Sequence, residues 1–137
     1  MKLVWSTLLA LMALCSFTLA SEDPTKRATR LDLLELNAAD GFSIKEYTIE
    51  SGTYYRWRIR SDGREEYKLV APELFRESWI DQVVVEDLEV KPFGLHAVEF
   101  DDAGDIDIWF IPIRPGRYTY SIVGLETQGF SGEFIVK

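Results

Sequence analysis

The chain has 137 residues, of which 47% are hydrophobic and 28% charged, and its formal net charge is −8 at pH 7. This length is enough for one domain with a substantial hydrophobic core. The acidic balance argues against a nucleic-acid-binding protein, which needs basic patches for phosphates, and the single cysteine excludes a framework of internal disulfides.

The first 20 residues have the pattern of a secretory signal peptide. Lys2 precedes an apolar run over 3–14, and the segment ends in Thr-Leu-Ala (18–20), with small residues at the two positions that a signal peptidase reads. The run is shorter than the roughly 20 residues of a membrane-spanning helix. We therefore expect cleavage after Ala20 and a periplasmic mature chain without a membrane span. A lipoprotein anchored at Cys15 is the alternative, which the bulky leucine directly before the cysteine disfavours.

Cleavage at this point changes the chemistry of the mature chain. It removes Cys15, so no thiol remains for a disulfide or a metal–thiolate bond. It also removes Lys2 and no carboxylate, which brings the formal net charge from −8 to −9. Such a charge favours solubility and leaves a basic protein or a cation as candidate partners. We expect residues 21–30 to form a mobile polar lead-in and residues 31–137 to form the domain.

The domain begins with short strand patterns separated by turns. The strongest is TYYRWRIRS (53–61), in which Tyr55, Trp57 and Ile59 alternate with three arginines. This period of two predicts a strand with one buried face and one basic face. The Asp-Gly pair that follows predicts a hairpin turn. Further strand patterns are LDLLELN (31–37), IKEYTIE (44–50) and YKLVA (67–71).

The middle of the domain differs from its start. PELFRESW (72–79) begins with Pro and Glu, which suit a first helical turn, and its apolar residues recur at helical spacing, so we expect one short helix. IDQVVVEDLEVKP (80–92) is rich in β-branched residues and predicts a strand. Four more strand patterns follow at 94–100, 105–113, 117–123 and 131–137. Short strands at this spacing predict an all-β sandwich with one short helical insertion.

The second half of the domain resembles a known family. IWFIPIRPGRYTY (108–120) and GFSGEFIV (129–136) are similar to segments of the cupredoxins, the blue copper proteins. In that family a Pro-Gly-x-Tyr-x-Tyr segment leads into the copper-binding loop, and a Gly-Met-x-Gly element opens the last strand. The resemblance extends from Ile44 to Lys137 and implies a cupredoxin-like Greek-key β-sandwich.

The resemblance also indicates where copper ligands would lie, and each of these positions is substituted. Ile122 takes the place of the cysteine, Phe130 that of the axial methionine, and Glu126 or Thr127 that of the second histidine. The first histidine would fall near Tyr67. A type-1 copper site needs two histidines, a thiolate and a weak axial ligand. We therefore expect apolar side chains in place of the metal, and no cofactor.

Three other signals have a structural and a functional interpretation. His96 is the only histidine, and one histidine alone makes no metal site, so we interpret it as a surface or structural residue. The alternative is a copper-binding protein, a Cu(II) carrier or a protein related to electron transfer, that uses His96 and oxygen ligands. DDAGDID (101–107) has aspartates near calcium-loop spacing but lacks the loop's glycine and glutamate, which predicts a hairpin turn. Ser121 has no nucleophile elbow around it.

Phe75 and Trp79 fall in the predicted helix and have two interpretations. They either pack onto the sheet or form an exposed aromatic patch that docks a partner. No catalytic or phosphate-binding motif occurs in the chain. The sequence thus predicts an exported cupredoxin-like binding or accessory protein that is not an enzyme, has no type-1 copper site and meets a basic periplasmic partner.

Overall fold

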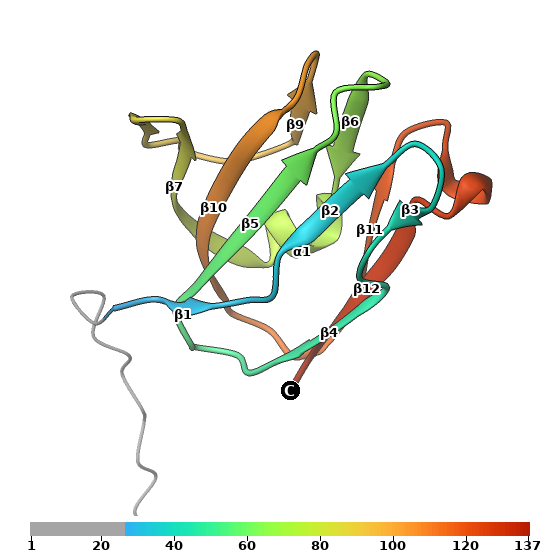
Figure 1. Cartoon of the computed structure of the whole chain (residues 1–137). Helices are drawn as coiled ribbons and strands as arrows, with labels where there is room; N and C mark the ends of the chain where they lie inside the picture. The colour runs from blue at the N-terminus through green and yellow to red at the C-terminus, as the bar shows by residue number, and fades with distance from the viewer. Residues whose placement is uncertain (1–26) are drawn as a thin grey trace, which may run out of the picture.

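The computed structural model describes residues 27–137, which form two β-sheets packed face to face (Figure 1). The predicted signal peptide, Cys15 and the start of the lead-in lie outside the described residues. Sheet A runs in the order β3-β2-β5-β10-β7-β8, with β1 also paired to β5. Its strands are β1 (Thr29–Arg30), β2 (Leu34–Asn37), β3 (Gly41–Phe42), β5 (Tyr55–Ser61), β7 (Ser78–Val85), β8 (Leu88–Val90) and β10 (Gly104–Pro112).

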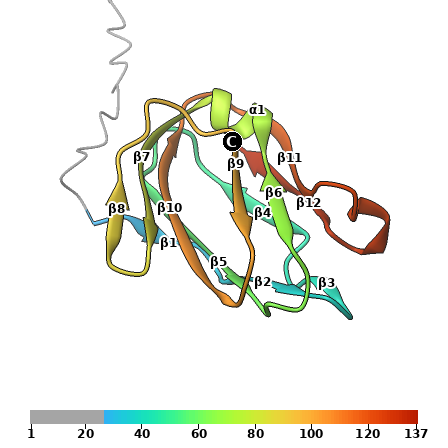
Figure 2. The same cartoon turned by 90° about the horizontal axis from the view of Figure 1, so that it is seen from above.

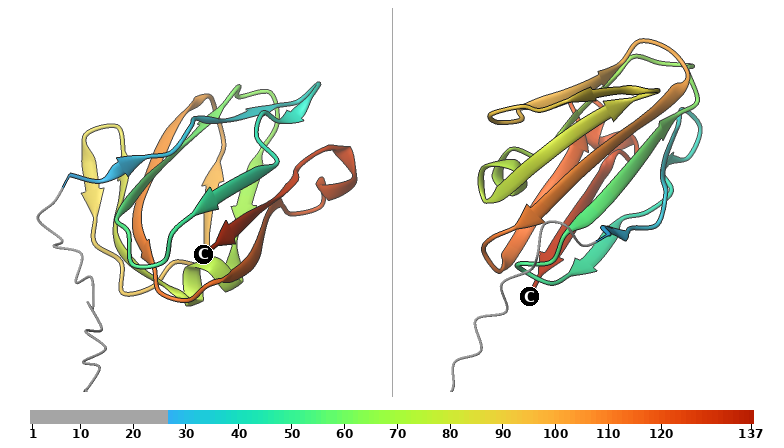
Figure 3. Two further views of the ribbon diagram at one scale, coloured as in Figure 1. Left: turned by 90° about the horizontal axis from the view of Figure 1, so that it is seen from below. Right: turned by 90° about the vertical axis from the view of Figure 1, so that its left-hand side faces the viewer.

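Sheet B has five strands in the order β4-β12-β11-β6-β9. They are β4 (Glu46–Ile49), β6 (Tyr67–Val70), β9 (Ala97–Phe100), β11 (Gly116–Ile122) and β12 (Ser131–Val136). The helix α1 (Pro72–Arg76) contacts β7 and β11, one strand from each sheet, and closes one end of the sandwich (Figure 2). The opposite end carries the loops 38–40, 62–66 and 123–130, the last of which contains a 3-10 helix, η1 (Glu126–Gln128) (Figures 1 and 3). We call this opposite end the pole.

An aromatic cluster fills the space between the two sheets. Trp57 of β5 is fully buried and meets the rings of Tyr120 and Phe134 of sheet B edge-on, at centroid distances of 5.4 and 5.0 Å. Tyr47 stacks on Phe134 at 4.9 Å. The period-two pattern of 53–61 is confirmed, since its apolar residues enter this core and its arginines face outward.

The Pro-Gly-x-Tyr-x-Tyr segment has a structural role at the turn into β11. The hydroxyl of Tyr118 donates a hydrogen bond to the carbonyl of Arg114 (2.9 Å), which ties the turn to the strand, as a tyrosine corner does. The hydroxyl of Tyr120 crosses the core and donates to the carbonyl of Ile44 (2.7 Å). The ring of Tyr120 lies directly against Gly132, where a Cβ would overlap it. These contacts explain the tyrosines and the glycine without a metal.

Two predicted boundaries were wrong. The helix expected over 72–79 ends at Arg76, because Ser78 and Trp79 pair with Pro112 and Ile111 of β10 and so belong to β7. The single strand expected over 80–92 is a hairpin of β7 and β8. Its turn includes Glu86 in a left-handed conformation (φ 54°), a conformation that non-glycine residues adopt only occasionally.

The lead-in predicted as mobile also differs at its end. Thr29 and Arg30 form β1, which pairs in parallel with Tyr55 and Arg56 of β5. The first strand of the domain is correspondingly short, with β2 beginning at Leu34. Within the described residues, no helix has the length and apolar character needed to span a membrane.

Candidate functional site

Apolar side chains close the pole at the positions that correspond to copper ligands. β11 ends at Ile122, whose backbone N–H donates to the carbonyl of Phe130 (3.0 Å) and so closes the loop between them. Both side chains are buried, and the ring of Tyr67 at the start of β6 lies 5.3 Å from that of Phe130. The structure therefore brings Tyr67, Ile122 and Phe130 into one packed cluster.

The hydroxyl of Tyr67 is committed to a neighbouring carboxylate. It donates to Oδ1 of Asp62 (2.9 Å), which also accepts the backbone N–H of Arg64, while Oδ2 accepts the backbone N–H of Ala38 (2.9 Å). Burial alone would raise the pKa of Asp62, but these hydrogen bonds together lower it below its usual value. Burial and the hydrogen bond to Asp62 raise the pKa of Tyr67, so the phenol stays protonated at neutral pH. Asp62 thus joins three segments at the pole.

The short strand β3 covers the other side of the cluster. The ring of Phe42 meets that of Phe130 edge-on at 5.4 Å and stacks on Tyr120 at 5.2 Å. Its backbone N–H donates to the carbonyl of Gly129 (3.1 Å). The approach of the two segments requires glycine at position 41, because a Cβ on Gly41 would overlap the backbone of Gly129 and because φ is +78°.

This donor set does not fit a type-1 copper ion. Ile122 and Phe130 offer hydrocarbon where the family resemblance places a thiolate and a thioether, and the phenol of Tyr67 is already hydrogen-bonded. Thr127 lies exposed on η1, outside the buried cluster. His96 is exposed in the loop before β9. Within residues 27–137, no group of three or more His, Cys, Asp or Glu side chains is arranged to hold a metal ion.

The aromatic pair of the predicted docking patch does not form one surface. Phe75 lies on the buried side of α1 and packs into the core, so the docking interpretation is wrong for this residue and the packing interpretation is right. Trp79 lies on β7 and is 45% exposed. The separation arises because pairing with β10 turns position 79 out of the helix and onto the outward side of sheet A.

A ladder of ion pairs runs along the outer face of sheet A. β5 and β10 place Arg60 opposite Asp105 and Arg58 opposite Asp107. Arg58 forms a two-bond contact with Asp107 (2.7 and 2.8 Å), and Arg56 donates to the same carboxylate (2.7 Å). Burial opposes ionisation of Asp107, yet the two guanidinium groups lower its pKa below the usual value. The turn expected within 101–107 is present at 101–103, but it is not a hairpin turn, because β9 belongs to sheet B and β10 to sheet A. Asp105 and Asp107 belong to this ladder.

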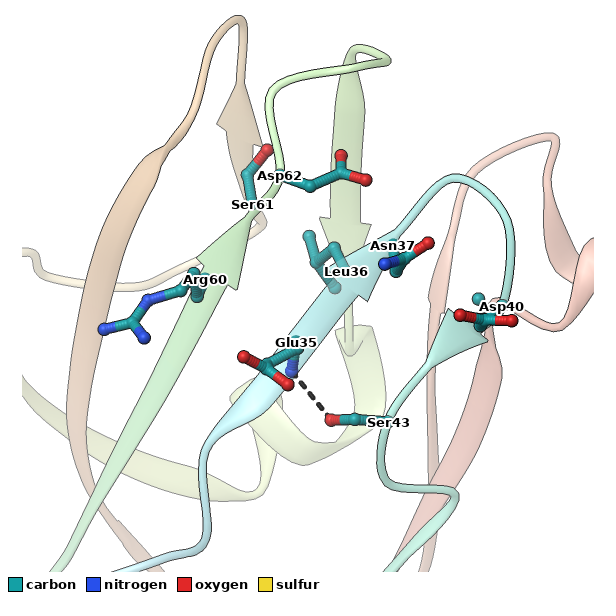
Figure 4. A pocket seen from close by; sticks show the side chains of 9 residues that line it. Glu35, Leu36, Asn37, Asp40, Ser43, Arg60, Ser61 and Asp62 are labelled. Carbon is teal, nitrogen blue, oxygen red and sulfur yellow. Dashed lines mark hydrogen bonds between the residues drawn. The ribbon is translucent and has the colours of Figure 1, made fainter.

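A pocket of about 350 Å³ opens beside β2, β3 and the end of β5 (Figure 4). Its polar lining consists of Glu35, Asn37, Asp40, Ser43, Arg60, Ser61 and Asp62. Several of these groups are already engaged: Ser43 accepts the backbone N–H of Glu35 (2.8 Å), and Arg60 pairs with Asp105 (2.7 Å). The lining contains no cysteine or histidine, and both of its serines, Ser43 and Ser61, bond to backbone, so the pocket brings no nucleophile and base together.

A second, shallower cleft of about 530 Å³ lies at the pole. Three carboxylates, those of Glu65, Glu66 and Asp101, line it together with Arg64 and with apolar Val123 and Leu125. Four charged groups with an excess of carboxylates give this side of the pole a negative surface, in keeping with the net charge of the chain.

Comparisons with solved structures identify the fold. The chain is similar to a multicopper oxidase from Campylobacter jejuni, a metallo-oxidase (TM-score 0.57, 9% identity), over 85% of this chain and 31% of that one. It is similar to auracyanin from Roseiflexus castenholzii (TM-score 0.53, 14% identity), over 82% of this chain and 99% of auracyanin. A multicopper oxidase from Pseudomonas thermotolerans matches with a TM-score of 0.60 and 11% identity, over 80% of this chain and 30% of the oxidase.

These likenesses establish a cupredoxin-like β-sandwich and confirm the family resemblance at the level of the fold. The chain spans less than a third of each oxidase and nearly the whole of auracyanin. No family model and no curated protein matches the sequence. At these identities the fold is shared, while ligands and activities have to be argued from the residues present.

Proposed function

We propose that this chain is an exported binding or accessory domain that uses the cupredoxin-like frame without a type-1 copper ion and without enzymatic activity. The observation that carries the proposal is the buried cluster of Ile122, Phe130 and Tyr67 at the pole. Hydrocarbon side chains and a protonated phenol stand at the positions that the family resemblance assigns to copper ligands. A packed cluster of this kind stabilises the loop 123–130 by burial instead of by ligation.

Export to the periplasm is supported by the signal-peptide pattern of residues 1–20, and the absence of enzymatic activity by the engaged polar groups of the pocket beside β2. The mature charge of −9 and the carboxylates of the cleft at the pole support a basic protein as the partner. Encounter with such a partner should weaken as salt is raised, because exposed charges are screened beyond roughly 10 Å at 0.1 M salt.

Copper titration of the purified exported protein tests the proposal. We expect no intense visible band on addition of Cu(II), because the mature chain has no thiol to form a copper–thiolate bond. We also expect little or no rise in melting temperature, since a ligand stabilises only by binding the native state. An intense thiolate band, or stoichiometric tight copper with a large rise in melting temperature, would overturn the proposal.

A matched variant separates weak surface binding from a built site. Pale, weak copper binding that disappears in His96→Ala would arise from the exposed histidine together with carboxylates, and would favour the copper-carrier alternative. The intact mass of the same preparation checks export: a chain that begins at Ser21 agrees with cleavage after Ala20. A mass that retains residues 1–20, or carries lipid on Cys15, contradicts it.

A further inference from the structure

Two rows of apolar side chains on the inner face of sheet A run from the core out into solvent. Residues directly opposite each other in antiparallel strands point to the same face, so each row crosses β10, β7 and β8. One row is Ile106, Val85 and Leu88, with exposed fractions of 7%, 41% and 72%. The other row is Ile108, Val83 and Val90, with exposed fractions of 0%, 8% and 53%.

The rise in exposure has a simple cause in the topology. Sheet A continues past β10 through β7 to β8, whereas sheet B ends at β9 (Figure 2). Only the turn 101–103 separates β9 from β10, so β9 stands opposite the start of β10. The inner face of β8, and of β7 at its last residue Val85, therefore has no second layer above it. We call Val85, Leu88 and Val90 the overhang.

The edge of sheet B beside the overhang is open. β9 pairs with β6 on one side, and within residues 27–137 no backbone hydrogen bond joins the other side of Ala97–Phe100 to another segment. A strand added there would lie about 4.8 Å from β9 and, at the usual sheet separation of about 10 Å, opposite the overhang. A strand added to the free edge of β8 would instead leave Leu88 and Val90 uncovered, because it would extend the same layer.

The charges around the open edge indicate the chemistry of the partner. Glu86 and Asp87 lie at the turn of the β7–β8 hairpin, Glu99 is exposed on β9, and Asp101 and Asp102 follow it. None of these five carboxylates forms an ion pair within the described part of the chain. A second copy of this chain would bring the same carboxylates together, which is unfavourable. A basic segment would neutralise them.

We infer that β9 accepts an extended basic segment of a partner protein as an added strand of sheet B. The apolar side chains on one face of the segment cover Val85, Leu88 and Val90, and lysine or arginine side chains on the other face lie near Glu99 and the two turns. Backbone hydrogen bonds along β9 provide affinity for the segment. Its alternating apolar and basic side chains provide specificity, because each kind faces a matching surface. The inference rests on the binding role proposed above and names the surface and the partner chemistry for it.

A synthetic strand peptide tests the inference. The probe is a capped, fluorescently labelled peptide of alternating valine and lysine, titrated with the mature protein and followed by anisotropy. One control peptide has proline at two central positions, which removes backbone donors, and another has glutamate in place of lysine. We expect binding of the first peptide only, weakening as salt is raised, together with new protection of the backbone amides of 97–100 against hydrogen exchange.

Matched protein variants locate the binding surface. The double variant Leu88→Ser/Val90→Ser should weaken binding about tenfold or more, because it removes apolar area that the peptide buries. The control variant Ile113→Ser changes a comparably exposed apolar residue elsewhere and should leave binding within about twofold of the parent. All of these side chains are more than half exposed, so both variants should fold.

Four results would each overturn the inference. They are failure of the valine–lysine peptide to bind, equal binding of the proline peptide, no effect of Leu88→Ser/Val90→Ser, and protection that appears on β8 instead of β9. Dimerisation of the free protein through this edge would also overturn the inference, because the added strand would then come from a second copy of the chain. The copper titration is independent of these readouts, so the strand site can fail while the copper-free proposal stands, and the reverse also holds.

Discussion

The hydroxyl of Tyr67 donates a hydrogen bond to the carboxylate of Asp62 (2.9 Å) at the position where the family resemblance places a metal-binding histidine. The same carboxylate holds the backbone of Ala38 (2.9 Å), so one side chain connects β6 to the loop after β2. In a copper site the metal would tie these segments together. Here a carboxylate and a phenol form the connection, and the pole is held by hydrogen bonds around an apolar cluster.

Removing the phenol should weaken this connection measurably. Tyr67→Phe keeps the ring against Phe130 and deletes only the hydrogen bond, which should lower the free energy of unfolding by about 1–2 kcal/mol at pH 7. Urea unfolding measures the loss. The pKa of Asp62 should rise in the variant, because one of its three donors is gone, and a carbon-detected NMR titration of the carboxyl group reports that pKa. An unchanged Asp62 titration would contradict the proposed connection.

Local pattern was enough to predict much of the fold. The alternation over 53–61 predicted which face of β5 is buried, because side-chain direction in a strand depends only on parity. Pairing partners cannot be read in this way. The arginines of β5 and the aspartates at 105 and 107 each showed a period of two, yet nothing local indicated that β10 lies beside β5 and brings them together.

The errors have equally specific causes. The turn at Glu86 and Asp87 contains Asp as its only common turn residue, and glutamate takes the left-handed position, so a run of β-branched residues was interpreted as one strand when it contains a hairpin. Helical spacing continued through Trp79, but pairing with Ile111 of β10 overrode that local preference. Of the substituted ligand positions, Ile122, Phe130 and Tyr67 meet at the pole, while Thr127 lies on the exposed 3-10 helix.

The two aspartates of the outer ladder should differ strongly in their contribution to stability. Asp107 is nearly buried and serves Arg56 and Arg58, whereas the side chain of Asp105 is 31% exposed. Asp107→Asn should cost about 2–3 kcal/mol, less than the 3–5 kcal/mol of a fully buried pair because Arg58 remains partly solvated. The matched control Asp105→Asn should cost less than about 1 kcal/mol. Equal losses in urea unfolding would show that burial does not control this ladder.

The ion pairs of Asp107 with its arginines determine part of the protein's response to acid. The pKa of Asp107 is lowered in the folded protein, so its contribution to stability is present above the pKa of the unfolded chain and is lost as the pH falls through the folded pKa. Unfolding free energies measured from pH 6 down to acid should therefore fall more steeply for the parent protein than for Asp107→Asn. Parallel curves for the two proteins would contradict this role.

Two glycines in strands should differ in how much an added methyl group destabilises the protein. A Cβ on Gly132 of β12 would overlap the ring of Tyr120, which is fixed in the core by its bond to Ile44. Gly132→Ala should therefore cost about 1–3 kcal/mol, the usual penalty for overpacking. Gly104→Ala, at the start of β10, meets no atom within 4 Å and should change stability by less than about 0.5 kcal/mol. Thermal unfolding compares the two, and a harmless Gly132→Ala would mean that Tyr120 can leave its site.

The last prediction concerns the side chain at the cysteine position. Ile122 is buried at the end of β11, and its backbone is bonded to Phe130, so Ile122→Ala should open a cavity in the pole and cost about 2–5 kcal/mol. The neighbouring Val123 is 52% exposed, and Val123→Ala should cost less than about 0.5 kcal/mol. Urea unfolding with unchanged m-values measures both losses. In the proposed function packing and not ligation closes the pole, so Cu(II) should not restore the stability that Ile122→Ala loses. A loss below about 1 kcal/mol, or recovery on addition of copper, would show that the pole is not held by apolar packing.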